Sequence, residues 1–244
     1  MFILYLWTNF SLNYQIKRTD LLSEKNLKNI IILYQKDNIK VSTIKNKKRK
    51  YRLINYSLLN NELENIFKNE LKQFIDKLNN KTSVLIVGLG NENIIADSLG
   101  PKVINKIKVN LNSKNNIKIS TLEPGVLSQT GINTQRIIKS IEKEIKADFL
   151  IIIDSLVSNR ASSLEKNIQI SLEGISVGSG LIGISTKIDE REIGKPIIVV
   201  GVPTALEIEI NKELYLLSTS NIDYFINDMA DLISRSINDV LKFY

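Results

Sequence analysis

The chain contains no cysteine and no histidine among its 244 residues. It therefore cannot build a disulfide, a thiol nucleophile, a zinc-finger site or a Ser-His-Asp triad from its own residues. Any acid–base chemistry must use Asp, Glu, Lys, Tyr or backbone groups, and the sequence predicts no cofactor and no metal. A hydrophobic fraction of 43% with 24% charged residues is otherwise typical of a folded globular chain.

Long hydrophobic runs are also missing. A helix needs about 20 apolar residues to span a bilayer, and no segment approaches that length. The apolar stretch Met1–Tyr14 lacks the basic start, long apolar core and small-residue cleavage site of a signal peptide. We interpret it as a packed strand or a removable leader rather than a membrane element. We therefore expect a soluble, cytoplasmic protein with no membrane partner.

Glycine and proline are absent from the first 87 residues, since all 11 glycines and all 4 prolines lie between Gly88 and Pro203. Charge divides the chain at nearly the same place. Residues 1–80 carry 15 Lys+Arg against 7 Asp+Glu, whereas the remainder carries 18 against 19. We predict a basic N-terminal appendage, residues 1–80, and a compact α/β core, residues 81–244.

Much of the basic excess lies in Lys45–Arg52, KNKKRKYR. Such a run can contact phosphate or an acidic protein surface. The alternative is a solvated hairpin turn or loop, which we favour because no aromatic platform or nucleic-acid motif accompanies the run. Nucleic acid is not an expected partner.

The core is predicted to alternate strands with helices. Apolar runs predict buried strands at Ser83–Val87, Ile117–Leu122, Phe149–Ile153 and Pro196–Val200. Helical periodicity and capping predict helices at Ser98–Ile107, Thr134–Ile145 and Ile222–Leu241. The alternation in Ile168–Leu172 indicates a half-exposed edge strand. This order predicts an α/β three-layer sandwich around a mostly parallel sheet.

Polar residues follow the buried strands at the edge where ligands bind in such sheets. Asn91 and Asp97 follow the first strand, Asp154 follows Ile153 directly, and Thr204 follows the last strand. Asp97 and Asp154 would then meet at one sheet edge, where a carboxylate pair can share a proton, activate water or hold a divalent cation. In the alternative interpretation Asp97 only caps the following helix and Asp154 only ends its strand.

The glycine-containing turn Gly88-Leu-Gly-Asn91 also resembles part of a dinucleotide-binding fingerprint. The complete G-x-G-x-x-G pattern is missing, because Ile94 and Ile95 occupy the region of the third glycine. We do not predict nucleotide binding.

A series of short motifs, in order along the chain, resembles the germination (spore) protease family. The resemblance covers roughly residues 15 to 241. Its motifs are Arg18-Thr-Asp-Leu21, Gly88-Leu-Gly-Asn91, Ala96-Asp-Ser-Leu-Gly-Pro101, Glu123-Pro-Gly-Val126, Gln129-Thr-Gly131, Ala147-Asp-Phe149, Ile153-Asp-Ser-Leu156, Gly178-Ser-Gly180, Gly201-Val-Pro-Thr204 and Ser220-Asn-Ile-Asp223.

This resemblance implies an aspartate-dependent endopeptidase that degrades small acid-soluble spore proteins during germination, located in the forespore or spore core. It also implies a self-processing zymogen with a propeptide of about residues 1–17, and a tetrameric assembly. The family's two essential aspartates fall on Asp97 and Asp154. The implied fold is similar to that of the hydrogenase maturation proteases, whose nickel-binding positions include a histidine that this chain lacks.

The sequence departs from the family pattern at several positions. Asn159 and Ser163 occupy positions where the family carries arginine, Leu181-Ile-Gly-Ile184 replaces a Gly-Asn-basic pattern, and the region after Thr204 is short. Two alternatives therefore stay open: a non-catalytic relative that binds spore proteins or a sister protease as a regulator, and a metal-dependent protease of the maturation type.

Overall fold

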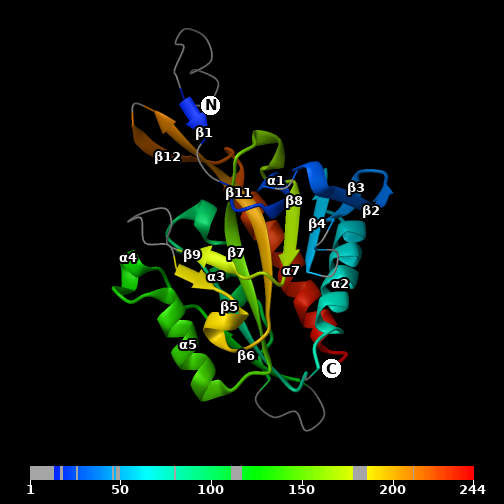
Figure 1. The fold of residues 1–244 in the computed structure, drawn as a ribbon, viewed down its shortest axis with the longest axis vertical. Coiled ribbons are helices and arrows are strands. Elements are labelled where there is room, and N and C mark those ends of the chain that lie inside the picture. The colour runs from blue at the N-terminus through cyan, green and yellow to red at the C-terminus, as the bar shows by residue number, and fades with distance from the viewer. Residues whose placement is uncertain are drawn as a thin grey trace.

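A computed structural model describes residues 14–16, 19–25, 27–45, 47, 50–79, 81–110, 117–177, 186–210 and 212–244 (Figure 1). The strands are β1 (Tyr14–Ile16), β2 (Ile30–Lys36), β3 (Ile39–Ile44), β4 (Tyr51–Tyr56), β5 (Ser83–Gly88), β6 (Lys118–Leu122), β7 (Phe149–Ser158), β8 (Asn167–Ser171), β9 (Ile175–Val177), β10 (Thr186–Ile188), β11 (Ile197–Ile210) and β12 (Glu213–Leu217). The helices are α1 (Leu22–Lys25), α2 (Asn61–Ile75), α3 (Leu99–Ile104), α4 (Leu127–Thr130), α5 (Thr134–Ile145), α6 (Glu190–Ile193) and α7 (Ile222–Leu241), with 3₁₀ turns η2 (Leu27–Asn29), η3 (Ile95–Asp97) and η4 (Ala161–Ser163).

The main sheet has the strand order β2-β3-β4-β8-β11-β7-β5-β6, and β1 and β12 pair with the far end of the long strand β11. The four strands β11, β7, β5 and β6 are parallel to one another, as the buried apolar runs predicted. The strands from β2 to β8 continue the sheet in antiparallel pairing. The predicted α/β class is confirmed.

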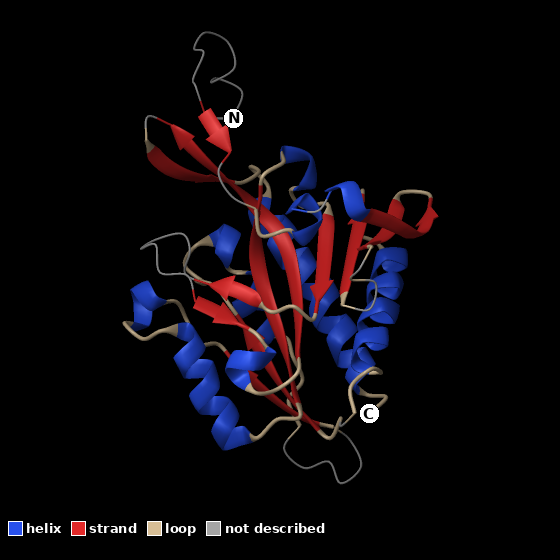
Figure 2. Cartoon of the chain, viewed as in Figure 1, coloured by secondary structure: helices blue, strands red, loops and turns tan. Residues whose placement is uncertain are grey.

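Helices cover both faces of the sheet (Figure 2). On one face, α2, α3 and α7 bury a large apolar cluster that includes Phe67, Phe149 and Met229. On the other face, Ile138 of α5 and Ile193 of α6 pack against alternate residues of β5, β7 and β11. Successive strand residues point to opposite faces, so the continuous apolar runs of β5 and β7 supply both clusters.

The two amphipathic helices α5 and α7 have the bounds that their periodicity predicts. The strands β7 and β11 extend well beyond their apolar runs, to Ser158 and Ile210. The prediction of a half-exposed edge strand at Ile168–Leu172 is wrong, because β8 lies between β4 and β11 and every residue of it is buried. Its polar residues find partners there: the Asn55 amide donates to Asn167, and Leu22 N donates to Gln169 Oε1 at 2.9 Å.

Residues on both sides of position 80 share one sheet and one core. Strand β4 pairs with β8, and α2 places Leu63, Phe67 and Leu71 in the same apolar cluster as α7. The division into an appendage and a core at residue 80 stays a prediction. Because α2 and α7 share this cluster, we expect them to unfold together.

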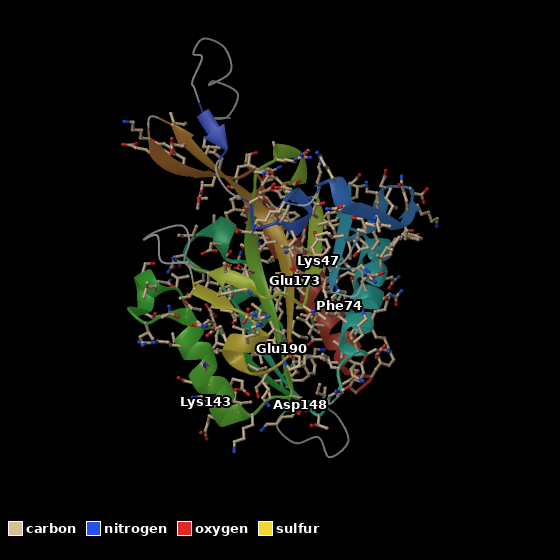
Figure 3. The ribbon with its side chains drawn as sticks, in the orientation of Figure 1. Lys47, Phe74, Lys143, Asp148, Glu173 and Glu190 are labelled. Atoms are coloured by element: carbon tan, nitrogen blue, oxygen red, sulfur yellow. The ribbon has the colours of Figure 1, made fainter. Side chains whose placement is uncertain are left out.

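The basic run begins in the connection between the antiparallel strands β3 and β4, as the hairpin interpretation predicts. Within it, Lys47 forms an ion pair with Glu173 (Figure 3). Arg52 instead lies inside β4, nearly buried, with Nε 2.8 Å from Glu70 Oε2 of α2. Arg52 therefore contributes to packing between the sheet and α2 rather than to a solvated loop.

No helix in the described parts of the chain combines the length and apolarity needed to cross a bilayer. Of the apolar stretch Met1–Tyr14, only Tyr14 is described, as the first residue of β1. The interpretation of this stretch as a packed strand or a leader lies outside the described residues.

We predict that Phe67→Ala lowers the free energy of unfolding by about 3–5 kcal/mol, because it opens a cavity in a fully buried cluster. Urea unfolding followed by far-ultraviolet circular dichroism should show a single transition at lower urea. Leu58→Ala is the matched control, since Leu58 is 66% exposed and its truncation should change stability by no more than about 0.5 kcal/mol. Two separated transitions in Phe67→Ala would contradict a shared core.

Candidate active site

Asp154 lies within β7 at the height where the neighbouring strand β5 ends. Gly88, the last residue of β5, pairs with Ile153, and Leu89 N still donates to Ile153 O at 2.9 Å. On the other side Asp154 stays in register with Gly201 of β11. Asp154 does not end its strand, because β7 continues to Ser158. Its carboxylate therefore projects from an ordered strand at the point where β5 leaves the sheet.

Asp97 lies on the 3₁₀ turn η3, between the end of β5 and the start of α3. Its carboxylate accepts a hydrogen bond from the backbone of its own loop, with Asn91 N 2.9 Å from Oδ2. The predicted role as a helix cap is wrong: Ser98 occupies the cap position of α3, and no side chain caps it. The loop folds back so tightly that a Cβ on Gly90, whose φ is +117°, would lie 1.9 Å from the Asp97 carbonyl oxygen.

Burial raises the pKa of Asp97 to about 6, and the hydrogen bond from Asn91 opposes this rise. Desolvation acts in this direction because it disfavours the charged form of a carboxyl group. A carboxyl that titrates close to neutral pH can hold or release a proton during a reaction, as a general acid or base must.

The structure brings the Asp97 turn to the same edge of the sheet as Asp154. The turn η3 lies against both β7 and β11. Thr204 of β11 fixes it there, since Oγ1 donates to the carbonyl oxygen of Ala96 at 2.6 Å. The turn that carries Asp97 and the strand that carries Asp154 thus lie together at this edge, whereas the assignment of the two aspartates as catalytic residues stays a prediction.

The surroundings of Asp97 include two residues that the sequence analysis named only as parts of family motifs and not as site residues. Gln129 of α4 donates through Nε2 to Asn91 Oδ1 at 2.6 Å, so α4 is tied to the loop that holds Asp97. Sequence spacing gives no sign of this contact, because the two residues are 38 positions apart. Glu123 also lies on this side of the sheet, after β6, and burial together with Glu92 raises its pKa.

Among the described residues, no cluster of three or more Asp and Glu side chains could hold a metal ion. The two aspartates alone supply few ligands for a divalent cation, which takes six or more oxygens in the case of Ca²⁺. The predicted absence of a metal stays a prediction.

Two of the positions that depart from the family pattern lie near the far end of β7. The backbone N of Asn159 donates to Glu24 Oε2 at 2.9 Å, and its Oδ1 is buried without a hydrogen-bond partner. Ser163 ends the turn η4. The motif Gly178-Ser-Gly180 and the divergent Leu181–Ile184 lie outside the described residues.

The fold and the site define an α/β protein with two carboxylates at the carboxyl edge of its parallel strands. A germination protease family profile matches residues 33–211, and the chain belongs to the germination protease family.

Curated relatives agree with this assignment. The germination protease of Clostridium acetobutylicum is 36% identical over 194 residues, covering 75% of this chain and 56% of the relative. That of Bacillus licheniformis is 34% identical over 197 residues, covering 74% of this chain and 52% of the relative. The chain thus spans about half the length of the curated relatives it matches.

Solved structures similar to this chain include the hydrogenase maturation protease HycI of Thermococcus kodakarensis, with 16% identity and a TM-score of 0.44 over 69% of this chain and 98% of that one. The hydrogenase maturating endopeptidase HybD of E. coli has 15% identity and a TM-score of 0.35 over 64% of this chain and 93% of that one.

The raised pKa of Asp97 leads to a prediction about stability. The folded state holds this proton more tightly than the unfolded chain does, so the contribution of Asp97 to stability is greatest below about pH 4 and falls as pH rises through 6, by up to roughly 3 kcal/mol. Asp97→Asn cannot ionise. It should match the wild type near pH 4 and be the more stable protein near pH 8, as measured by urea unfolding at both values.

Asp148→Asn is the control with the opposite sign. Partial burial raises the pKa of Asp148, but hydrogen bonds from Thr82 and Ser83 outweigh this and lower it. This variant should therefore lose stability mainly at high pH. A stability difference between Asp97→Asn and the wild type that is the same at both pH values would show that the Asp97 pKa is not raised.

Proposed function

We propose that this chain is an aspartate-dependent endopeptidase that hydrolyses small acid-soluble spore proteins in the spore core during germination. Membership of the germination protease family supports the peptidase activity, and the substrate class is the one that the sequence motifs imply by resemblance. The observation that carries the proposal is that the turn η3, which bears Asp97 with a pKa raised by burial to about 6, lies against β7, the strand that bears Asp154.

In the proposed mechanism the two carboxyl groups divide the proton transfers. Asp154, as the carboxylate, accepts a proton from a water molecule while the water oxygen bonds to the peptide carbonyl carbon. Asp97, whose pKa burial raises to about 6, acts in its protonated form and donates its proton to the amide nitrogen as the carbon–nitrogen bond breaks. Exchange of both protons with solvent restores the starting state. This division follows from the rule that two acids in different environments take opposite roles.

We also propose that the enzyme is made as a zymogen whose propeptide comprises about residues 1–17. The segment that follows is tied to the body of the protein: Asp20 N donates to Val157 O at 2.8 Å, and Val157 N donates to Asp20 Oδ2 at 3.0 Å. Leu21 is fully buried beside Leu156. Cleavage before this segment would leave the end of β7 covered. A tetramer of such chains is the assembly that the family suggests.

A non-catalytic regulator that binds spore proteins or a sister protease is the second candidate. It is favoured by Asn159 at a family arginine position, where its side-chain oxygen is buried without a partner, and by the half-length match to the curated relatives. The regulator would bind a small acid-soluble spore protein without cleaving it.

Purified wild-type protein should cleave a small acid-soluble spore protein at a few sites, as seen by mass spectrometry of the products. Asp97→Asn and Asp154→Asn should each lower kcat by about 100-fold or more, because each removes one proton transfer. Asp148→Asn is the matched control, since Asp148 lies before β7 at the opposite edge of the sheet and should leave kcat unchanged (Figure 3). Cleavage that persists in both variants would contradict the assignment of Asp97 and Asp154 as catalytic residues. Tight binding of the spore protein by the wild type without cleavage would favour the regulator.

Terminal sequencing tests the zymogen proposal separately. After exposure to mild acid, a new N-terminus close to Lys17–Leu21 is expected, together with a gain in cleavage activity. A protein that retains Met1 and already cleaves substrate would rule out a removable propeptide.

A further inference from the structure

We propose that Thr204 is a positioning residue for Asp97, and that its buried hydroxyl holds the turn carrying Asp97 in place over the end of β7. The inference rests on the proposed function for its catalytic consequence. Its structural content, the tether between β11 and η3, can be tested without any activity.

Thr204 lies at a β-bulge of β11 beside this turn. In the parallel pairing of β11 with β7, Pro203 pairs with Leu156 and Ala205 pairs with Val157, so Thr204 is left between them as an extra residue. Bulges bend a strand locally and re-aim side chains, and they are frequent beside active sites. Thr204 falls in the alternation of Val200 and Val202, which belong to the cluster on the α3 and α7 face. Its side chain therefore leaves the sheet on the face where η3 lies.

The contact itself is short and shielded from water. Thr204 is 1% exposed, and its Oγ1 lies 2.6 Å from the carbonyl oxygen of Ala96, the residue immediately before Asp97. A valine at this position would fill nearly the same volume but would leave that carbonyl without its donor. Loss of one partner from a buried hydrogen bond leaves the other partner desolvated and unpaired, which drives local rearrangement.

The tether reaches across the strand that carries Asp154. The strand order is β11, β7, β5, and the loop of Asp97 begins at the end of β5. Neighbouring strands lie about 4.8 Å apart, so the loop must pass over β7 to reach Thr204. On the β5 side, Asp97 is held by the hydrogen bond from Asn91 N to Oδ2 at 2.9 Å. The two bonds together fix the turn from both sides of β7, which sets where the Asp97 carboxyl lies relative to Asp154.

Three variants test the tether. Thr204→Val removes the hydroxyl at nearly constant volume, Thr204→Ser retains it, and Thr43→Val removes a comparable buried bond from Thr43 Oγ1 to Tyr51 O, 2.8 Å long, in the β3–β4 hairpin. Small displacements of a catalytic group cost up to about 100-fold in rate. We expect Thr204→Val to lower kcat by about 10- to 100-fold, with KM changed by less than about 3-fold. The kcat of Thr204→Ser should lie within about 3-fold of the wild-type value. Thr43→Val should leave kcat unchanged.

Amide hydrogen exchange at Asn91 tests the tether independently of cleavage activity. The Asn91 amide donates to Asp97, so its exchange should become at least about 10-fold faster in Thr204→Val and stay at the wild-type rate in Thr204→Ser and Thr43→Val. Unchanged Asn91 exchange in Thr204→Val overturns the inference, whatever the rate of cleavage, and so does a Thr204→Ser variant as impaired as Thr204→Val. If Asp97→Asn cleaves as fast as the wild type, the proposed function fails, while the exchange measurement still decides whether Thr204 holds the turn.

Discussion

The close approach between the end of β5 and the start of α3 determines where the site lies. A Cβ on Gly88 would lie 2.4 Å from the carbonyl oxygen of Gly100, and a Cβ on Gly100 would lie 2.2 Å from that of Leu89. The helix therefore rests directly on the strand that precedes it, which glycine permits because it has no side chain. With α3 held there, the short turn η3 lies against β7 and β11 at the carboxyl edge of the sheet. Asp97 comes to lie beside β7 for this reason.

The far end of β7 is held by residues that are distant in sequence. Beyond Asp154 the strand is covered by the segment 19–25, where Glu24 accepts hydrogen bonds from Thr19 Oγ1 at 2.6 Å, from Ser158 Oγ at 2.7 Å and from Asn159 N at 2.9 Å. Strand β4 pairs with β8, and helix α2 packs against the sheet in the large apolar cluster. The parallel strands beside the aspartates thus pack against elements from the N-terminal third of the chain.

Sequence reasoning succeeded where a local pattern fixes the answer. The 3.6-residue period predicts α5 and α7, and the apolar runs predict the parallel strands. The rule that sites lie at carboxyl strand ends selects Asp97 and Asp154, and their catalytic role stays a prediction. Sequence reasoning failed where burial or a hydrogen bond depends on a residue that is distant in the sequence. Gln169 looked like the exposed face of an edge strand, but it is buried against Leu22. The bond from Asn91 to Asp97 depends on the backbone of Gly90, and the bulge at Thr204 leaves no trace in strand alternation.

The central claim is that the tight loop between β5 and α3 shelters Asp97 enough to raise its pKa to about 6 at the edge of the sheet where Asp154 lies. Titration of the Asp97 carboxyl carbon by nuclear magnetic resonance, assigned by comparison with Asp97→Asn, tests it most directly. The account predicts that this carboxyl titrates with a pKa of about 6. A pKa at or below the ordinary aspartate value of about 3.9 would contradict it, because Asp97 would then be ionised throughout the pH range in which the enzyme is proposed to act.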